Sequence, residues 1–428
     1  MLKLALIVNS EDTLKKFFDF FEENRDKIEK RISQKIGITY ILNLIAEKEP
    51  DFSAAEEYKK AEFIADYNKI LADSEVDIIM DLCRHRKSFD YLEQALENKK
   101  TVITTNPKVI AKNYLEIKEL ELKFESRVYF SAAFSPLPLK TLIDNYYALD
   151  ELKEFNAVLN ATTNYVLAEM EKNTISMKET IERARELSYT EEDTDLDLNG
   201  LDSLNKLILL ADLFFDTAVD PELISAKGIK GITSYDLIYA SELGYKIKLV
   251  CTIKKEDENL YLGVSPNLVP RNSFLASINE NSNGVELYTK YNSKTIFKAE
   301  NCDSAAVNLL SLDLISAVKS ITEKKGAVSD LALNKFKEAD LYQNKSSSFY
   351  IRLQLEKDEE IINKIKRIFS EKNLADLILH DNLTETPLLP VIIMTKKIKK
   401  KDLEKLLEEV EALEGVLTVN NIIAVKED

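Results

Sequence analysis

The order of apolar and polar positions in the first third of the chain predicts short buried strands that alternate with helices. Apolar runs of strand length lie at residues 2–8, 38–45, 76–82, 101–105 and 127–132. Segments of helical period lie between them, at residues 12–33 (with Ser10 as N-cap), 61–71, 89–97 and 109–124. Strands that alternate with helices form a parallel, doubly wound sheet. We therefore expect an α/β fold whose first domain, residues 1–132, is Rossmann-like.

The middle of the chain predicts a mixture of helices and antiparallel strands. A strand at residues 155–160 and a helix at 177–187 are followed by two strands that we expect to pair antiparallel, at 245–253 and 260–266. A long apolar helix follows at residues 305–321. This mixture indicates an α+β domain over residues 133–299.

The last part of the chain predicts a separate small domain. Residues 327–348 are polar and indicate a linker. Residues 349–428 then give strand, helix, strand, strand, helix and strand, which is the order of the ferredoxin-like fold. The six elements are predicted at residues 349–355, 359–371, 375–380, 391–396, 401–413 and 418–425.

Composition narrows the class of protein. The 428 residues carry a net charge of −16, which argues against nucleic acids and anionic membranes as partners. No secretory signal is recognised at the start, and no apolar run approaches the roughly 20 residues of a membrane span. Three scattered cysteines argue against a disulfide framework and for a reducing, cytoplasmic location. With only two histidines, a histidine metal site or a Ser–His–Asp triad is nearly excluded.

The densest cluster of acids lies within residues 188–215. Four of these acids alternate with other residues, so an extended segment would point them to one side: Glu191, Asp193, Asp195 and Asp197. Asn199 and Gly200 break the alternation, and apolar residues of helical period follow from Asp202 onward. Asp202 and Lys206 are four residues apart, so they share one face of the predicted helix.

This Asp–Lys pair has two interpretations. Asp202 can simply begin the helix, with Lys206 as its surface partner, and such pairs contribute little to stability. Alternatively, the apolar neighbours Leu204, Leu207 and Ile208 hold the lysine away from water, in which case it needs a buried partner. A partly buried pair beside free carboxylates suits an amino acid, because its ammonium and carboxylate groups need opposite charges.

Three motifs resemble those of the homoserine dehydrogenase family. Residues 189–207, YTEEDTDLDLNGLDSLNKL, are similar to the family's substrate segment. Upstream, LNATTNYVLAEM from Leu159 resembles LNGTTNYIL. Downstream, KGIKGITSYDLIYASELGYKIKL from Lys227 resembles the run that begins EGI and ends LGYxIKL. The motifs stand in the family's order, and the resemblance extends over nearly the whole chain.

The resemblance implies NAD(P)-dependent interconversion of L-aspartate 4-semialdehyde and L-homoserine, a step of threonine and methionine biosynthesis, with NADP or NAD as cofactor. The substrate-binding residues would be Glu191, Asp197, Tyr189 and Thr162. Asp202 and Lys206 would be catalytic and handle the proton at the carbonyl. For Thr162 and its neighbour Thr163, capping of the next helix is the alternative role.

The resemblance also concerns the architecture. It implies that residues 300–325 return to the first domain, that the protein is a homodimer, and that residues 349–428 form an ACT regulatory domain. Such domains bind small amino-acid effectors, but the usual glycine near the first helix is Glu360 here. Holding a dimer together is therefore an alternative role for this domain.

The nucleotide-binding half departs from the family's motifs. The loop after the first strand, Val8-Asn9-Ser10-Glu11, has no glycine, although glycine is what lets the backbone approach a pyrophosphate. Glu11 and Asp12 place negative charge at the start of the helix instead. A lysine of the family is replaced by Pro107. Besides the loop, family residues are missing from four segments: 81–85, 104–107 (which contains Pro107), 135–138 and 299–303.

Two hypotheses about function follow. The first is an active homoserine dehydrogenase, since the substrate motif is kept. The second is a binding protein that keeps the amino-acid site but has lost the cofactor site. Such a protein would sense homoserine, threonine or a relative, either alone or paired with an active paralogue.

Overall fold

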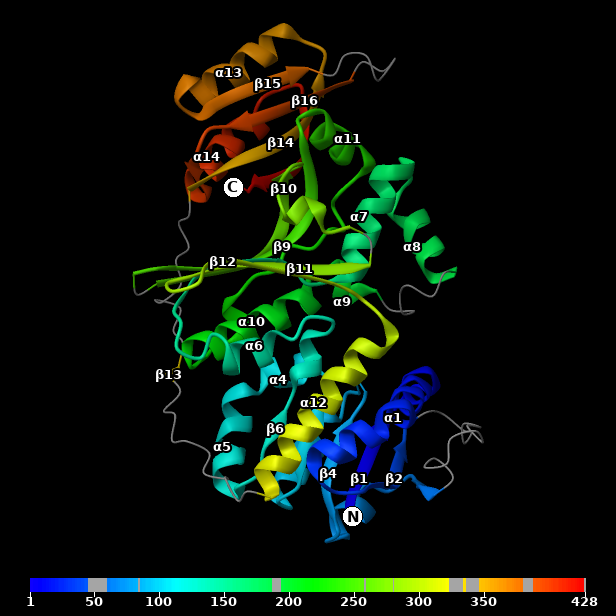
Figure 1. Cartoon of the computed structure of the whole chain (residues 1–428). Coiled ribbons are helices and arrows are strands. Elements are labelled where there is room, and N and C mark those ends of the chain that lie inside the picture. Colours follow the sequence, from blue (N-terminus) through cyan, green and yellow to red (C-terminus); the bar gives the residue numbers. More distant parts are fainter. Residues whose placement is uncertain are drawn as a thin grey trace. The chain divides into compact units, whose positions relative to one another are not determined.

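The computed structural model describes residues 1–44, 60–83, 85–186, 194–257, 259–279, 281–322, 334–335, 346–379 and 388–426 (Figure 1). The chain forms two compact units. Unit 1 consists of Met1–Glu151, Asn205–Leu223 and Ala299–Lys337. Unit 2 consists of Leu152–Leu204, Ile224–Lys298 and Glu338–Asp428. The boundaries of the three domains predicted from the sequence stay a prediction.

Unit 1 is built on a six-stranded sheet of order β3-β2-β1-β4-β5-β6. All neighbouring strands are parallel, as the sequence predicts. The order reverses between β1 and β4, so the loops after these two strands meet at the carboxyl edge of the sheet, where ligands of doubly wound sheets bind. The strands are β1 (Leu2–Val8), β2 (Ile36–Asn43), β3 (Glu62–Ile64), β4 (Val76–Asp81), β5 (Thr101–Thr104) and β6 (Val128–Tyr129).

The helices of unit 1 begin where the sequence offers a cap. Ser10 caps α1 as predicted, because its Oγ accepts from Thr13 N at 3.3 Å. Asn106 does the same for α4, whose first residue is Pro107. The helices of this unit include α1 (Glu11–Ile32), α3 (Ser88–Glu97), α4 (Pro107–Lys112), α5 (Tyr114–Phe124), α6 (Leu139–Asn145) and α12 (Asp303–Thr322).

Three predictions for unit 1 need correction. Residues 61–71 are not one helix: they contain β3, which pairs with β2, and then α2 (Asn68–Ala72). The predicted helix 109–124 is broken at Asn113, whose side-chain amide donates to Val109 O at 2.8 Å. The strand predicted at 127–132 shortens to β6, because Ser131–Phe134 form a 3₁₀ turn. The helical spacing of apolar residues predicts a continuous helix in the first two cases. Strand pairing overrides that spacing in the first case, and the Asn113 side-chain hydrogen bond overrides it in the second.

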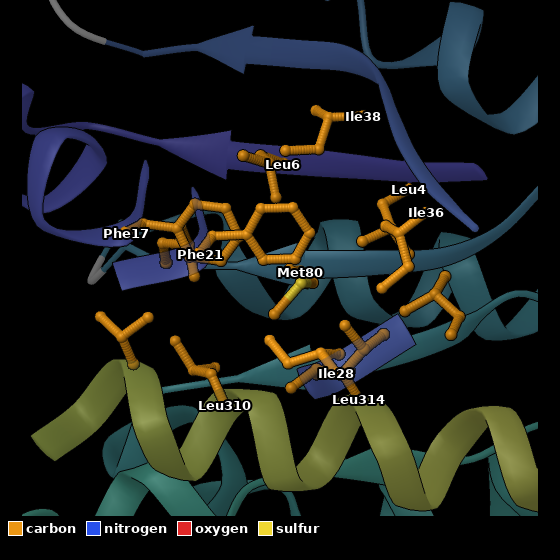
Figure 2. Packing of buried hydrophobic residues seen from close by; sticks show 14 of the residues in the cluster. Leu4, Leu6, Phe17, Phe21, Ile28, Ile36, Ile38, Met80, Leu310 and Leu314 are labelled. Carbon is orange, nitrogen blue, oxygen red and sulfur yellow. The ribbon is translucent and has the colours of Figure 1, made fainter. Parts of the chain in front are cut away.

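The core of unit 1 lies between the sheet and two helices (Figure 2). Leu6 and Met80 from the strands meet Phe17 of α1 and Leu310 of α12 in one buried cluster. By length and composition alone, α12 is the one helix among the described residues that would suffice to cross a membrane, with a mean hydropathy of 1.3 over Ser304–Thr322. The prediction that no apolar run approaches this length is therefore wrong for α12.

Two short strands complete unit 1. β8 (Thr217–Ala218) pairs in parallel with β13 (Asn334–Lys335). β13 falls inside the predicted linker of residues 327–348, most of which lies outside the described residues.

Unit 2 contains the predicted antiparallel strands. β9 (Tyr245–Glu256) pairs with β10 (Asn259–Pro270) in one continuous antiparallel register, and β7 pairs with both β9 and β11. Helices α7 and α11 lie against β9. The remaining elements of this part are β7 (Leu152–Val158), β11 (Ser282–Thr289), β12 (Ser293–Glu300), α7 (Ala161–Asn173), α8 (Met177–Glu186) and α11 (Ser234–Glu242).

The C-terminal part of unit 2 has the predicted strand-helix-strand-strand-helix-strand order, and its strands lie in the order β18-β14-β16-β15. β18 also pairs in parallel with β10, joining Asn267 to Ala424, so the two sheets are continuous. The elements are β14 (Ser346–Glu356), α13 (Glu359–Asn373), β15 (Leu374–Leu379), β16 (Leu388–Thr395), β17 (Ile398–Lys399), α14 (Lys400–Glu411) and β18 (Val416–Val425).

Candidate functional site

Two of the alternating acids lie in a short helix. Asp195 and Asp197 belong to α9 (Asp195–Leu198), in which Leu198 N donates to Thr194 O at 2.9 Å. The extended arrangement predicted from the alternation is therefore wrong for these two residues. A helical turn leaves Asp195 exposed and Asp197 half-buried, so only Asp197 is drawn into the site.

The other predicted residues of the segment divide into two groups. Tyr189, Glu191 and Asp193 lie outside the described residues. Gly200 stands at φ 78°, a conformation that favours glycine, and turns the chain from α9 into α10 (Leu201–Phe215). The break predicted at Gly200 and the helix predicted after it are both confirmed.

Asn160 brings two of the predicted carboxylates together. Its Nδ2 donates to Asp197 Oδ1 at 2.7 Å and to Asp202 Oδ2 at 3.1 Å. Its Oδ1 accepts from Thr163 N at 2.8 Å, which caps α7. One buried side chain therefore fixes the start of a helix and the spacing of two acids. Two carboxylates held this close attract a cation such as an ammonium group.

Asn160 itself was not among the residues predicted from the sequence. The available signal was its place directly before a helical segment, where asparagine is a preferred cap. Capping by a threonine hydroxyl is wrong here, because the cap is Asn160 and the Thr163 hydroxyl donates to Asn160 O at 3.1 Å. Thr162 lies half-buried in the first turn of α7.

Asp202 and Lys206 are both buried on α10, with 5% and 7% of their surface exposed. Leu207 and Ile208, next to the lysine, are fully buried. The interpretation of this pair as a surface cap and its partner is therefore wrong. A buried ammonium group four residues after a buried carboxylate gives the helix both charges that an amino acid requires.

The segment after the acidic helix passes very close to it. Ile229 N donates to Leu198 O at 2.8 Å, and Lys230 Nζ bonds Asp195 Oδ1 at 2.8 Å. Directly before Ile229, a Cβ on Gly228 would stand 2.0 Å from Leu198 O and 2.5 Å from the Cα of Asn199. Only glycine allows this approach, which holds α9 in place.

Replacing Gly228 by alanine is expected to displace α9 and to lower the free energy of unfolding by about 1–3 kcal/mol, as overpacking does. Urea unfolding measures the change. Gly231→Ala is the matched control, because the nearest atom to a Cβ there is Asn421 Oδ1, at 3.5 Å. A loss at Gly228 no larger than that at Gly231 would contradict the role given to this contact.

A second buried cation lies outside the acidic cluster. Lys248 of β9 is 2% exposed, and its Nζ donates to Asn164 Oδ1 at 2.6 Å and to Ile278 O at 2.5 Å. Burial without a carboxylate among these hydrogen-bond acceptors lowers the pKa of Lys248 to about 7. Asn164 lies one turn after Asn160 on α7, so this lysine fixes the helix that carries the cap.

The lowered pKa of Lys248 predicts a pH dependence of stability. Above about pH 7 the folded protein holds a neutral lysine while the unfolded chain, with an ordinary lysine pKa, still binds the proton. Stability therefore rises with pH between about 7 and 10, by up to about 1.4 kcal/mol per pH unit from this group. Lys248→Met is expected to remove that rise, and substitution of the exposed Lys255 on the same strand by methionine is expected to leave it. Chemical unfolding at a series of pH values tests this, and equal slopes in wild type and Lys248→Met would contradict it.

The carboxyl edge of the sheet in unit 1 carries acidic residues at the carboxyl ends of both β1 and β4. After β1, Asn9, Glu11 and Asp12 are exposed, and Asp12 pairs with Lys16 at 2.6 Å. After β4, the buried Asp81 carboxylate accepts from Cys83 and Thr104. Burial raises the pKa of Asp81 to about 6. The polar groups named at this edge are thus mainly carboxylates and the side chains that donate hydrogen bonds to them.

Comparisons with known proteins were made by sequence and by structure. Residues 138–307 match the family model described as homoserine dehydrogenase, and residues 15–131 match the model of the homoserine dehydrogenase NAD binding domain. The chain is 25% identical to the homoserine dehydrogenase of Neisseria gonorrhoeae, over 92% of each chain. It is 24% identical to that of Bacillus subtilis, over 95% of this chain and 94% of the relative.

Solved structures share the fold. A homoserine dehydrogenase from Thiobacillus denitrificans superposes with a TM-score of 0.85 and 20% identity, over all of this chain and 98% of the other. The S. aureus homoserine dehydrogenase at pH 6.0 gives a TM-score of 0.74 and 22% identity, over all of this chain and 99% of the other. Both units of the chain therefore have counterparts in solved structures.

Proposed function

The chain belongs to the homoserine dehydrogenase family, and from that membership we propose that it binds homoserine or a closely related small amino acid and has little dehydrogenase activity of its own. The observation that carries the first part is the buried cluster around Asn160, in which Asp197 and Asp202 share one amide. Burial of Lys206 on the same helix as Asp202 supports it.

Each group of the cluster has a role in this proposal. Asp197 and Asp202 receive the ammonium or hydroxyl end of the amino acid, and Lys206 supplies the positive charge for the opposite end. In the family's reaction, Lys206 and Asp202 would move the proton at the carbonyl oxygen. Glu191, Tyr189 and Thr162 are proposed as further substrate contacts from the family motif alone.

The second part of the proposal concerns the cofactor. A nicotinamide cofactor is what the NAD binding domain of the family takes. The residues after β1 do not suit its pyrophosphate, because Ser10 and the exposed Glu11 and Asp12 occupy the start of α1. The matched range of this domain begins at residue 15 and so leaves out the loop of residues 8–11. Whether NADP or NAD would be preferred depends on the residues at the carboxyl edge of the same parallel sheet.

Calorimetry with homoserine, threonine and aspartate tests the amino-acid site. At least one of them is expected to bind, and Asp202→Asn is expected to weaken that binding, because it removes one of the two charges that face the ammonium group. Arg183→Met on α8, which removes an exposed ion pair with Glu179, serves as control. A folded protein that binds none of the three would refute the proposal.

An active dehydrogenase is the second candidate. The parallel sheet of order β3-β2-β1-β4-β5-β6 and the match to the NAD binding domain over residues 15–131 favour it. The chain would then interconvert L-aspartate 4-semialdehyde and L-homoserine, using a cofactor site rebuilt with other residues. Turnover with homoserine and either cofactor distinguishes this candidate from the first.

A homodimer is proposed from the family resemblance, built on the antiparallel sheet of unit 2 and on residues 349–428, for which an ACT-like role remains the proposal. Light scattering at micromolar concentration is expected to give twice the chain mass of 48.9 kDa. A single-chain mass over that range would contradict the dimer. A mixed dimer with an active paralogue would show instead as capture of dehydrogenase activity by this chain.

A further inference from the structure

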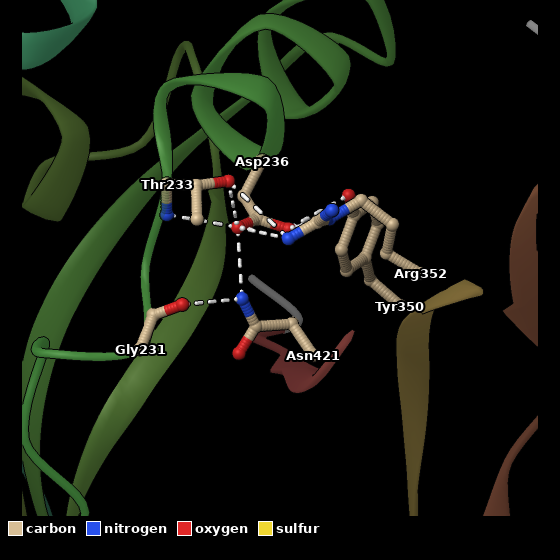
Figure 3. A network of polar contacts seen from close by, with 6 residues as sticks. All are labelled: Gly231, Thr233, Asp236, Tyr350, Arg352 and Asn421. Carbon is tan, nitrogen blue, oxygen red and sulfur yellow. Dashed lines mark hydrogen bonds and ion pairs between the residues drawn. The ribbon is translucent and has the colours of Figure 1, made fainter. Parts of the chain in front are cut away.

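A buried carboxylate joins the C-terminal domain to the rest of unit 2 (Figure 3). Asp236, in the first turn of α11, is completely buried. Its carboxylate accepts from Arg352 Nε at 2.7 Å, from Tyr350 OH at 3.2 Å and from Asn421 Nδ2 at 2.8 Å. Arg352 and Tyr350 lie on β14, and Asn421 lies on β18. Asp236, Arg352 and Asn421 are called the joint below.

Residues 226–236 form a short segment that ends at Asp236 of the joint. Nearer its start, the same segment contacts α9, the helix that carries Asp195 and Asp197. Asn421 Nδ2 also donates to Gly231 O at 2.7 Å, so a side chain of β18 is hydrogen-bonded to the middle of the segment. Lys227 makes a second hydrogen bond to β18, since its Nζ donates to Ile422 O at 2.9 Å. From the same few residues, Ile229 N reaches Leu198 O at 2.8 Å. The segment therefore contacts both β18 and α9.

The segment has little freedom to shift between these contacts. Ala226 forms a bridge with Val264 of β10, and Lys227 N donates to Val264 O at 2.8 Å. A Cβ added to Gly228 would stand 2.0 Å from Leu198 O, so the Gly228 backbone packs directly against the chain at Leu198 and Asn199. A displacement at Gly231 is therefore passed on to α9, because neighbouring parts of the segment are fixed at van der Waals contact.

We propose that the joint positions the acidic site, which is the cluster of Asn160, Asp197 and Asp202. Through Asp236, Arg352 and Asn421, the C-terminal domain fixes residues 226–236, and these residues in turn fix α9, the helix that carries Asp197. These three are positioning residues, because they act on the site through α9. The part of the inference that concerns affinity rests on the proposed binding of an amino acid. The part that concerns the position of α9 does not. By reciprocity, a ligand that tightens the site through α9 also steadies the joint.

Asn421→Asp is the sharpest test, because it keeps the shape of the side chain and replaces two donated hydrogen bonds by repulsion from Asp236. Hydrogen exchange of the Ile229 amide, in the protein without ligand, is expected to become about tenfold faster. The Kd for homoserine is expected to rise about tenfold. Asn173→Asp on α7 is the matched control, because it likewise replaces a hydrogen bond donated to a carboxylate, that of Glu169 at 2.8 Å, by repulsion, but lies outside residues 226–236 and β18, and it is expected to change neither quantity.

Arg352→Lys provides a second variant if Asn421→Asp does not fold. It keeps the positive charge but loses the forked contact with Asp236, and a smaller change in the same direction is expected, with Arg352→Met giving the larger one. Unchanged exchange at Ile229 in these variants overturns the positioning. Faster exchange with an unchanged Kd overturns the link to the site. If the wild type binds no amino acid, the proposed function fails, and the exchange measurement alone decides the inference.

Discussion

NADPH and NADH are expected to bind this chain weakly, and homoserine in excess is expected to give little or no turnover. A dinucleotide needs backbone N–H groups at the start of the first helix to approach its two phosphates closely, and glycine is what permits that approach. Here Ser10 caps α1 with its own side chain, and Glu11 and Asp12 place two carboxylates in its first turn. The loop therefore opposes the phosphates both by its side chains and by its charge.

The size of the effect follows from what is missing. A micromolar cofactor affinity represents roughly 8 kcal/mol, and several losses of a few kcal/mol each, at the loop, at Pro107 and at the late segment 299–303, would remove most of it. Fluorescence titration with either cofactor, together with a turnover assay, measures both parts. Glu11→Gln combined with Asp12→Asn removes the charge while leaving the side chains in place, and it is expected to recover only part of the affinity. Micromolar binding by the wild type with turnover near ~10 per second would contradict the prediction.

Much of the fold is predictable from the sequence because it depends on local patterns. The buried strand Leu2–Val8 and the Ser10 cap are correct because an apolar run and a capping residue act within a few positions of themselves. The segment 61–71 fails for the opposite reason. Its apolar residues include Phe63 and Ile64, which pair with β2 some twenty residues earlier along the sheet's edge, and no local pattern carries that information.

The site shows the same division. The shared helix face of Asp202 and Lys206 is predictable from their four-residue spacing, whereas the sequence leaves a surface pair and a buried pair both open, and burial decides between them. Asn160 is not, because its bonds to Asp197 and Asp202 span about forty residues. The predicted alternation of Asp195 and Asp197 is wrong because a single turn bonded to Thr194 O replaces the extended segment. What brings the acids together is thus a residue without charge.

The joint between β14, β18 and α11 is the strongest case of information beyond local patterns. Arg352 and Asn421 lie on predicted strands, and Asp236 fits a helix start, so each has an ordinary local role. Their contacts add side-chain bonds to the backbone pairing of β10 with β18, which joins the two sheets. The C-terminal domain therefore helps to position the acidic site. The linker predicted at residues 327–348 suggests instead a separate domain.

The largest loss of stability is expected on removing the buried lysine of α10. Lys206 is 7% exposed, and Asp202, one turn before it, is 5% exposed. Lys206→Met leaves the buried carboxylate without the nearest cation of its own helix, and breaking a buried pair costs on the order of 3–5 kcal/mol. Binding of the amino acid is expected to be lost together with the charge.

Lys230→Met is the matched control, because it also removes a lysine that lies near the acidic segment. Its bond to Asp195 joins side chains that are 44% and 71% exposed, and an exposed pair of this kind contributes about 0–1 kcal/mol. Urea unfolding at neutral pH compares the two variants, and calorimetry with homoserine compares their binding. If both variants lose the same small amount of stability, Lys206 and Asp202 do not stabilise one another. If Lys206→Met destabilises the protein but still binds homoserine as the wild type does, the lysine is structural and the opposite end of the amino acid must be held elsewhere.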